Sequence, residues 1–301
     1  MIFVRHAQSR WNVATKQPWN LTREVFRVDH SLTRRGHEQA MGLRRAAFGK
    51  KSSESAETTT DDLHKIKDAT TVWMSPYARA VQTALTGLLP LWADAEMDGT
   101  LPPHVVAGAP APSLQLRPLV RERKGLLSMD NVGGAKGGKV VSRAIKLLSS
   151  LPKSSRLAES VTGLMGGVSC DTSEVERRWW TRTRESRKQA VARAREMLSQ
   201  LQSSEHSTVV VVSHSHFLRS TFAEFLSEGA CAPELAAALR TKKVPNCGVV
   251  VCTLAPDGKL TRAAIGYMPT GSKPLVAEAK KSGKSNKAKA KQVVPAPEPE
   301  A

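Results

Sequence analysis

The sequence predicts an α/β fold, a three-layer α/β/α sandwich in which helices cover both faces of a mostly parallel central sheet. Residues 208–212, Thr-Val-Val-Val-Val, are β-branched, continuous and uncharged, as expected of a strand that is buried on both faces. Similar apolar runs alternate along the chain with longer helical patterns. Such alternation is typical of parallel strands that are joined by crossover helices.

The predicted strands are short apolar runs, several of which end at polar residues that could form a site. They cover residues 1–4, 71–74, 114–120, 208–212 and 248–254. Their lengths and their β-branched content favour strands over short helices. Because parallel strands end at the same edge of a sheet, the residues that follow the first, second and fourth runs are expected to meet.

The predicted helices lie between or after these strands. One begins near Thr33, whose hydroxyl can accept a hydrogen bond from the first turn. A second follows Pro76, because proline suits a first helical turn. Three more are predicted over residues 140–151, 173–202 and 217–226, and the helix over 173–202 is expected to be the longest.

One catalytic domain is predicted over residues 1–268, followed by a disordered tail rich in Lys, Ala and Pro over residues 269–301. Inside the domain, residues 50–70 and 152–172 have the composition of mobile surface insertions. Residues 13–30 are polar and irregular, which predicts a loop over the site.

The chain is strongly basic, with a net charge of +18 and a sequence pI near 10.1. The tail has seven Lys against three Glu, so most of the excess lies in the body of the chain. Such an excess favours anionic partners. We expect a phosphorylated substrate, either a small molecule or a phosphoprotein. Nucleic acid is a less favoured partner, since the tail has no aromatic residue on which a base could stack.

The four cysteines form no CxxC pair and show no metal-ligand spacing, and no apolar run approaches the roughly 18 residues of a membrane span. Nor does the sequence open with a secretory leader pattern. We therefore expect reduced thiols, a cytoplasmic location, no membrane partner, no metal and no cofactor. The sequence leaves the oligomeric state open.

Cations and imidazoles follow the ends of three predicted strands: Arg5 and His6 after the first, Arg79 after the second and His214 after the fourth. A pocket with two arginines favours a dianion, because the planar guanidinium matches phosphate oxygens two at a time. A histidine among cations is biased toward its neutral form, which leaves one nitrogen nucleophilic. The other histidine can stay protonated and donate to the transferred group.

Five segments carry motifs in a recognisable order. They are Arg5-His6-Ala7, Leu32–Ala40, Ser75–Ala84, Val212-Ser213-His214 with Phe217-Leu218-Arg219, and Asn246-Cys247-Gly248. This order is similar to that of the histidine phosphatase superfamily, in the branch that includes cofactor-dependent phosphoglycerate mutases and many small phosphatases. The resemblance implies a phosphoglycerate mutase-like fold.

The resemblance also implies roles for the site residues. His6 would attack phosphorus and become a phosphohistidine, while Arg5, Arg79 and His214 would hold the three equatorial oxygens. Ser9 and Asn12 stand where this family often makes further phosphate contacts, although both also suit a structural role in a loop.

Glu122 is the expected proton donor, both from its family position and from the strand that precedes it. Its basic neighbours Arg121, Arg123 and Lys124 disfavour a protonated carboxyl group, unless they point to solvent or bind the rest of the substrate. Asp130 is the alternative donor.

Three residues depart from the family pattern. Ala7 and Ser215 stand where the family has glycine, and His216 adds a second histidine two residues after His214. Strand alternation predicts that His214 and His216 face different ways, so His214 is kept in the site and His216 is read as a helix-start residue.

A phosphohydrolase is favoured over a mutase, because residues 123–127 do not resemble the substrate-closing segment of the mutases. A catalytically weak phosphate-binding or scaffold module is disfavoured, since all four core residues of the family are present.

Overall fold

The computed structural model describes residues 1–49, 58–92, 110–125, 129–150, 169–181 and 183–276, together with residues 108 and 163. Part of each expected insertion and most of the expected tail lie outside these residues. In the described part of the chain, no helix has the length and apolarity needed to cross a membrane.

The described strands form one eight-stranded sheet in the order β2-β8-β7-β1-β6-β3-β4-β5. Their bounds are β1 Ile2–Arg5, β2 Thr58–Thr59, β3 Thr71–Met74, β4 Ser113–Leu116, β5 Cys170–Asp171, β6 Val209–Ser213, β7 Val249–Leu254 and β8 Leu260–Met268. The five strands β1, β6, β3, β4 and β5 are mutually parallel, while β7 runs antiparallel to both β1 and β8. The predicted mostly parallel sheet is confirmed.

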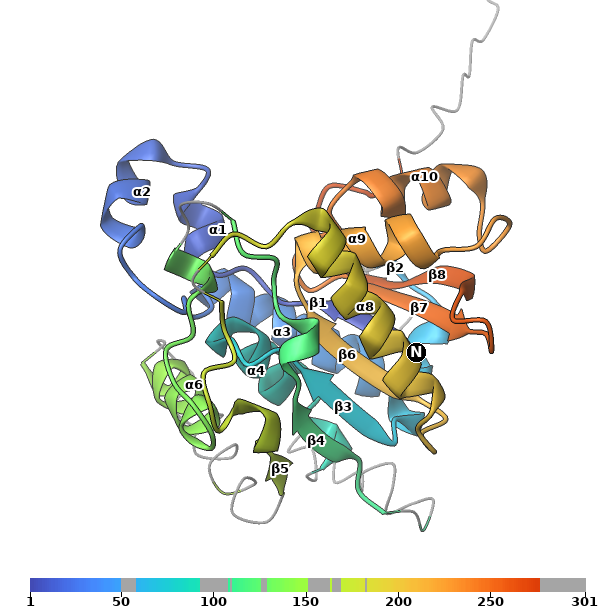
Figure 1. Cartoon of the computed structure of the whole chain (residues 1–301), viewed down its shortest axis with the longest axis horizontal. Coiled ribbons are helices and arrows are strands. Elements are labelled where there is room, and N and C mark those ends of the chain that lie inside the picture. The colour runs from blue at the N-terminus through green and yellow to red at the C-terminus, as the bar shows by residue number, and fades with distance from the viewer. Residues whose placement is uncertain are drawn as a thin grey trace, which may run out of the picture.

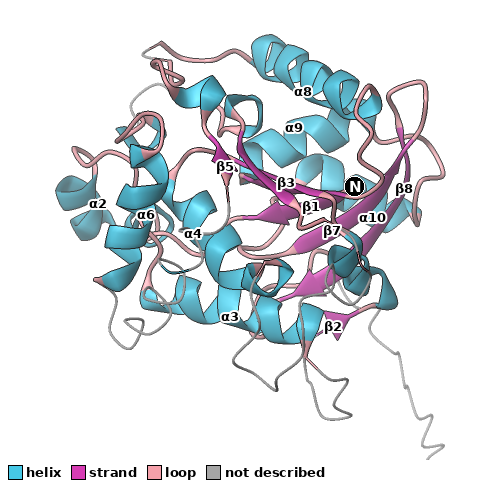
Figure 2. Ribbon diagram, turned by 90° about the horizontal axis from the view of Figure 1, so that it is seen from below, coloured by secondary structure: helices cyan, strands magenta, loops and turns pink. Residues whose placement is uncertain are grey.

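Helices cover both faces of this sheet, which confirms the three-layer α/β/α class (Figures 1 and 2). Their bounds are α1 Arg10–Ala14, α2 Pro18–Glu24, α3 Arg34–Phe48, α4 Ala78–Gly87, α6 Lys139–Ser149, α8 Arg187–Gln202, α9 Ser215–Phe225 and α10 Pro233–Thr241. Short 3-10 turns are η1 Asp61–Asp68, η2 Leu89–Leu91, η3 Pro118–Val120, η4 Met129–Asn131 and η5 Ser173–Val175. Figure 2 shows α3, α4 and α6 on one side of the sheet and α8 and α9 on the other.

The alternation of side chains along β1 divides the core between these two layers. Ile2 and Val4 belong to the cluster that includes Leu43 of α3, whereas Phe3 belongs to the cluster on the opposite face. There its ring meets that of Phe222 edge to face, with centroids 5.4 Å apart. The strand that carries Arg5 is therefore held rigidly from both faces.

Two segments differ from the expected elements. The expected loop over residues 13–30 contains the last two residues of α1 and all of α2, because Ser9 and Asn12 form a capping box and Pro18 begins α2. The expected helix over 173–202 begins only at Arg187, after a capping box from Ser186.

The edges of the sheet also differ from the expectation. The second half of the expected insertion 50–70 forms β2 and η1, and its side chains Leu63 and Ile66 are fully buried. Strand β8 was not predicted, and the expected strand 114–120 ends at Leu116, after which Pro118 begins a 3-10 turn. Leu275, in the expected tail, packs into the core.

Candidate active site

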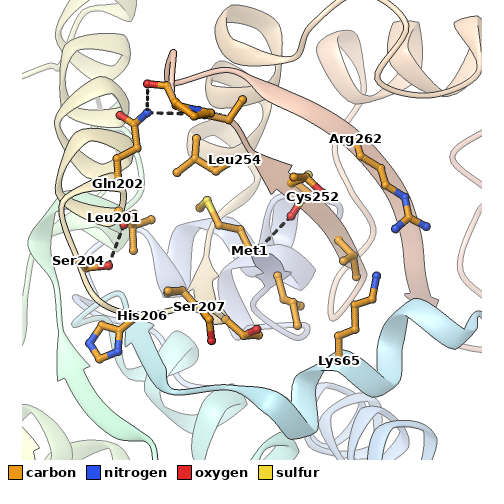
Figure 3. A pocket seen from close by; sticks show the side chains of 17 residues that line it. Met1, Lys65, Leu201, Gln202, Ser204, His206, Ser207, Cys252, Leu254 and Arg262 are labelled. Carbon is orange, nitrogen blue, oxygen red and sulfur yellow. Dashed lines mark hydrogen bonds between the residues drawn. The ribbon is translucent and has the colours of Figure 1, made fainter.

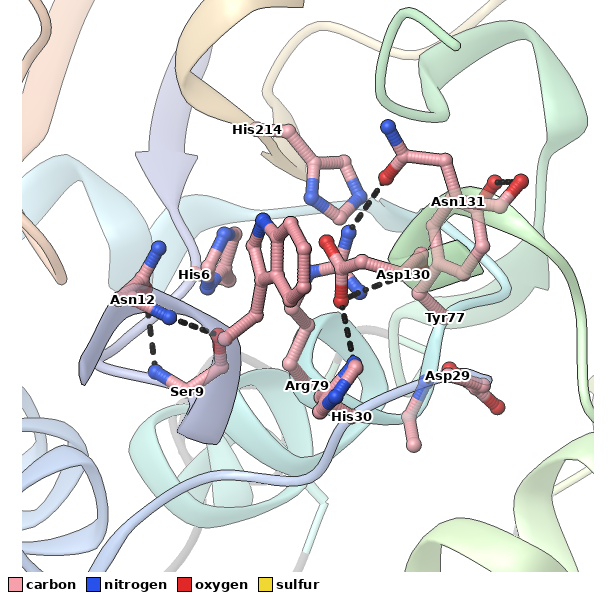
Figure 4. Close-up of polar contacts among 12 residues, drawn as sticks. His6, Ser9, Asn12, Asp29, His30, Tyr77, Arg79, Asp130, Asn131 and His214 are labelled. Atoms are coloured by element: carbon pink, nitrogen blue, oxygen red, sulfur yellow. Dashed lines mark hydrogen bonds and ion pairs between the residues drawn. The ribbon is translucent and has the colours of Figure 1, made fainter. Parts of the chain in front are cut away.

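Three neighbouring parallel strands bring the predicted histidines together. In the register of β1 and β6, Arg5 pairs with Ser213, so His6 and His214 leave the same edge of the sheet side by side. Their rings lie 4.9 Å apart between centroids, and both side chains are buried. Figure 4 shows the two rings beside the Arg79 guanidinium, which comes from α4. Residues far apart in sequence thus meet at one buried site.

The hydrogen bond of His6 fixes which ring nitrogen is free. His6 Nδ1 lies 2.7 Å from the carbonyl oxygen of Ala7. Because a carbonyl oxygen can only accept, Nδ1 carries the proton and Nε2 keeps its lone pair. Burial, followed by the charges of Arg79 and Arg5, holds the pKa of His6 well below its ordinary value of 6.5. His6 is therefore neutral near pH 7, with Nε2 available as a nucleophile.

His214 has a different set of contacts. Its Nε2 lies 2.7 Å from the hydroxyl of Ser75, which follows β3, and its buried Nδ1 has no hydrogen-bond partner among the described residues. Burial, followed by Arg79 and His6, lowers the pKa of His214 well below 6.5. In the site without a ligand, burial therefore favours the neutral form of this histidine over the protonated form that the sequence allows.

Arg5 is buried at the end of β1, with 7% of its surface exposed. Its Nη1 donates to the carbonyl oxygen of Val244 at 2.6 Å, whereas its Nε has no partner among the described residues. Burial lowers the pKa of Arg5 to about 10, and the nearby Glu122 opposes that shift. Arg5 thus remains a cation at neutral pH.

Arg79 is 1% exposed and has two side-chain acceptors at one end of its guanidinium. Nη1 donates to Asp130 Oδ1 at 3.0 Å and to the Asp130 carbonyl oxygen at 3.3 Å, and Nη2 donates to Asn131 Oδ1 at 3.1 Å. The buried Nε has no partner among the described residues. Arg5 Nε, Arg79 Nε and His214 Nδ1 together make three unpaired nitrogens around His6.

Ser9 and Asn12 cap helix α1 next to this pocket. The Ser9 amide donates to Asn12 Oδ1 at 3.1 Å, and the Asn12 amide donates to Ser9 Oγ at 3.4 Å. Asn246 joins them, since its side-chain amide donates to Asn12 Oδ1 at 2.9 Å and to the His6 carbonyl oxygen at 3.1 Å. This network links the late Asn-Cys-Gly motif to the loop that carries His6.

The Glu122 carboxylate lies against the first turn of α9, the helix that begins at Ser215, directly after His214. Oε1 accepts from the backbone amides of Arg123 at 2.9 Å and Phe217 at 3.1 Å, and Oε2 accepts from that of His216 at 3.3 Å. Glu122 is 7% exposed. These bonds hold the carboxylate near Arg5 and against the first turn of α9.

The extra residues after His214 lie in helix α9. Ser215 is buried at the first position of the helix, and His216 is half-buried, with its Nδ1 accepting from Arg219 at 3.1 Å. His216 therefore faces Arg219 rather than His6. Burial lowers its pKa, which the charge of Glu122 partly opposes.

Two further side chains at the site, Asp29 and His30, were missed by the sequence reasoning. Asp29 Oδ1 accepts from the Ala78 amide at 2.7 Å and so caps the helix that carries Arg79. His30 Nδ1 lies 2.9 Å from Asp130 Oδ1. Both residues were placed in a loop, and only their nearness to the Leu32 motif could have drawn attention to them.

The structure also has a cavity of about 480 Å³ at the other end of the strands, near the start of β1 and the end of β7 (Figure 3). Two of its cations, Lys65 and Arg262, are both paired with Asp62, at 2.6 and 3.0 Å. Burial raises the pKa of Cys252 in its wall to about 12, so that thiol stays protonated. This cavity contains no set of groups comparable to the His6 pocket.

Within the described ranges, no three His, Cys, Asp or Glu side chains are grouped so that they could hold a metal ion. The charged groups around His6 are arginines, which suit an anion instead of a cation.

Comparison with protein-family models gives one match: residues 136–264 match the model of the histidine phosphatase superfamily, branch 1. The match includes His214 and confirms the resemblance expected from the motifs. No curated protein sequence matches the chain.

Several solved structures are similar to the chain, each at low identity. A phosphoglycerate mutase from Bacillus anthracis str. Sterne is 15% identical over 89% of this chain and 92% of its own, with a TM-score of 0.42. A phosphoserine phosphatase from Entamoeba histolytica is 14% identical over 90% and 96%, with a TM-score of 0.39. A mycobacterial glucosyl-3-phosphoglycerate phosphatase is 15% identical over 89% and 96%, with a TM-score of 0.41. At these values the likenesses carry no argument about function.

Proposed function

From its resemblance to the histidine phosphatase superfamily, we propose that this chain is a phosphohydrolase that removes a phosphoryl group from a phosphate monoester through a phosphohistidine on His6. The observation that carries the proposal is the His6 ring itself. Its Nδ1 bond to the Ala7 carbonyl leaves Nε2 unprotonated, and burial, together with the charges of Arg79 and Arg5, lowers the pKa of the imidazole and keeps it neutral.

In the proposed first step, His6 Nε2 attacks phosphorus while the bond from phosphorus to the ester oxygen breaks. Arg5, Arg79 and His214 hold the equatorial oxygens as charge spreads over them. Each of the three has a buried nitrogen without a partner among the described residues, which matches a ligand with three acceptor oxygens. Ser9 and Asn12 are proposed as further phosphate contacts.

Glu122 is the proposed proton donor to the leaving oxygen. In the second step it takes a proton from the water that attacks phosphorus, the bond from phosphorus to Nε2 breaks, and phosphate and neutral His6 are released. Its place at the start of α9, beside His214 and Arg5, supports this assignment. Asp130 remains the alternative donor, although its Oδ1 already accepts from Arg79 and His30.

The proposed substrate is an anionic phosphate ester, either a small molecule or a phosphoprotein, and the reaction needs no metal or cofactor. The basic body of the chain supports an anionic partner. A phosphoglycerate mutase-type phosphotransferase and a catalytically weak phosphate-binding module are the competing functions. A cytoplasmic location remains a prediction.

The test is hydrolysis of an aryl phosphate in the presence of a metal chelator, between about pH 5 and 8, followed by trapping of acid-labile phosphate on the protein. We expect turnover and trapping in the wild type, and loss of both in His6→Ala. His64→Ala is the matched control, because His64 lies in η1, where its Nδ1 is 3.3 Å from the Ala47 carbonyl oxygen of α3, and, among the described residues, it belongs to no contact of the site. If His6→Ala still hydrolyses the aryl phosphate, the reaction does not proceed through a phosphohistidine on His6. Trapping followed by transfer to a second substrate, without release of phosphate, would favour the mutase.

A further inference from the structure

The guanidinium of Arg79 has two edges, and only one of them is occupied by the protein. Its Nη1 hydrogens point to Asp130 Oδ1 and to the Asp130 carbonyl oxygen, and one Nη2 hydrogen points to Asn131 Oδ1. The remaining donors are Nε–H and the second Nη2–H, which lie along one edge of the planar group. Nε is buried and has no partner among the described residues. This edge has the two-donor geometry that binds a phosphate in a bidentate manner.

The Asp130 carboxylate also contacts a buried histidine, His30. His30 Nδ1 lies 2.9 Å from the same Oδ1 that accepts from Arg79, and the His30 side chain is 1% exposed. On the other side of the ring, Nε2 faces the carbonyl oxygen of Glu24 at 3.1 Å and the Glu24 carboxylate at 3.2 Å. Figure 4 shows His30 next to the Asp130 carboxylate, which in turn lies against the Arg79 guanidinium.

Resting on the proposed function, we propose that Asp130, held by His30, is a positioning residue that clamps the Nη1 end of Arg79 and thereby presents its Nε–Nη2 edge to the phosphoryl group. A long arginine side chain has many rotamers, and fixing it before the ligand arrives removes that entropic cost from binding. Asp130 binds Nη1, whereas the phosphoryl group would bind Nε and Nη2. The carboxylate and the ligand therefore do not compete for the same donors.

The position of Asp130 distinguishes this role from two others. A carboxylate that blocked the site would occupy the Nε edge, yet Nε has no partner among the described residues. A general acid gives its proton to the leaving oxygen, so its loss would affect a basic leaving group most, whereas loss of a positioning residue affects all leaving groups alike. The free Nε edge therefore favours positioning over blocking, and the kinetic comparison below separates positioning from acid catalysis.

The test measures binding of orthovanadate and of inorganic phosphate by calorimetry, together with kcat/KM for two aryl phosphates whose leaving groups differ in basicity. We expect Asp130→Ala to weaken binding of both anions about 100-fold, because a displaced guanidinium loses its alignment. The loss in kcat/KM should be the same for both leaving groups. Asp130→Asn, which keeps an acceptor for Nη1, should recover most of the affinity. Asp62→Asn, which breaks an exposed ion pair at the other end of the sheet, should leave both readouts unchanged.

The coupling between Asp130 and Arg79 gives a second, independent measurement. In an Arg79→Ala background, adding Asp130→Ala should change vanadate affinity by no more than about twofold, since nothing is left to position. His30→Phe keeps the ring volume but removes the hydrogen bond to Asp130, and it should weaken vanadate binding in the same direction by a smaller factor. This variant serves if Asp130→Ala does not fold.

Three outcomes would overturn the clamp. The first is vanadate affinity that is unchanged or tighter in Asp130→Ala and His30→Phe. The second is a loss of kcat/KM confined to the more basic leaving group, which would make Asp130 the acid. The third is a wild-type protein that binds neither anion. A wild type that binds vanadate but turns over no ester would remove the proposed hydrolase. The clamp would still be supported there if the variants weaken binding as expected.

Discussion

His6 and His214 face each other from the ends of adjacent parallel strands, with ring centroids 4.9 Å apart. Each ring is oriented by one hydrogen bond: His6 by the carbonyl of Ala7 and His214 by the hydroxyl of Ser75. A side-chain substitution can remove the Ser75 hydroxyl but not the backbone carbonyl of Ala7. The hydrogen bond that orients His214 can therefore be tested by mutation, whereas the bond that orients His6 cannot.

Ser75→Ala should reduce kcat/KM about tenfold, the effect of losing one hydrogen bond that orients His214. The measurement is steady-state hydrolysis of an aryl phosphate, with circular dichroism to confirm the fold. Ser113→Ala is the control, because Ser113 bonds Thr71 at the opposite end of β3 and β4. Unchanged kinetics in Ser75→Ala would mean that His214 is oriented by packing alone.

Stability should fall with acid because two buried histidines are neutral in the folded protein. Their folded pKa values lie well below the unfolded value of 6.5, so below pH 6.5 the unfolded chain binds more protons than the folded one. Each histidine should therefore cost about 1.4 kcal/mol of unfolding free energy per pH unit, from 6.5 down to its folded pKa. Stability above pH 6.5 should not depend on these two groups.

Urea unfolding at several pH values measures this slope. His37 and His216, whose pKa values are also lowered, contribute in the same direction. Comparison of the wild type with His214→Gln therefore isolates one buried histidine. An equal slope in the two proteins would contradict the expected protonation state of His214.

Gly36→Ala should lower the unfolding free energy by about 1–3 kcal/mol, the usual cost of overpacking. A Cβ atom at this position would lie 2.0 Å from the carbonyl oxygen of Gln8, so helix α3 or the loop after His6 must move. Activity should fall together with stability. Gly138→Ala is the control, since a Cβ there has open space around it. Equal stability of the two variants in urea unfolding would rule out the close approach.

Arg193→Ala should destabilise the protein by about 3 kcal/mol, because it leaves the buried Glu185 carboxylate with only its longer ion pair, to Arg121 at 3.3 Å, among the described residues. Arg193 makes two bonds to that carboxylate, at 2.9 and 2.8 Å, and also donates to the carbonyl oxygens of Leu119 and Arg121. The second pair fixes the segment that leads to Glu122. Denaturant unfolding checks the cost, with the exposed Arg195→Ala on the same helix as control. A loss below about 1 kcal/mol would contradict the prediction.

The strands that end at the site could be predicted because the residue pattern that identifies each strand lies within a few consecutive residues. Continuous β-branched residues before His214 and apolar residues before Arg5 are visible in a single window of sequence. The Leu32 motif is equally local, since Thr33 caps α3 and Gly36 allows the close approach to Gln8.

The parts that could not be predicted depend on contacts between distant segments. Val175 and Trp179 have helical spacing, yet Trp179 lies in irregular backbone before α8, and its ring packs edge to face on Tyr77 with centroids 4.9 Å apart. The bond between Arg79 and Asp130 joins residues 51 positions apart. The neutral state of His214 follows from burial, which spacing does not reveal. Roles for Ser9, Asn12 and Glu122 remain predictions.

The position of β1 between β6 and β7 has a consequence for synthesis of the protein on the ribosome. Both strands that flank β1 lie more than 200 residues later in the chain, so His6 leaves the ribosome long before its neighbours exist. Closing so long a loop costs entropy that only the finished sheet repays. A nascent chain that lacks the β6–β7 region has His6 but neither His214 nor the strands that hold β1 in the sheet. The proposed phosphoryl chemistry therefore requires that synthesis has passed β7.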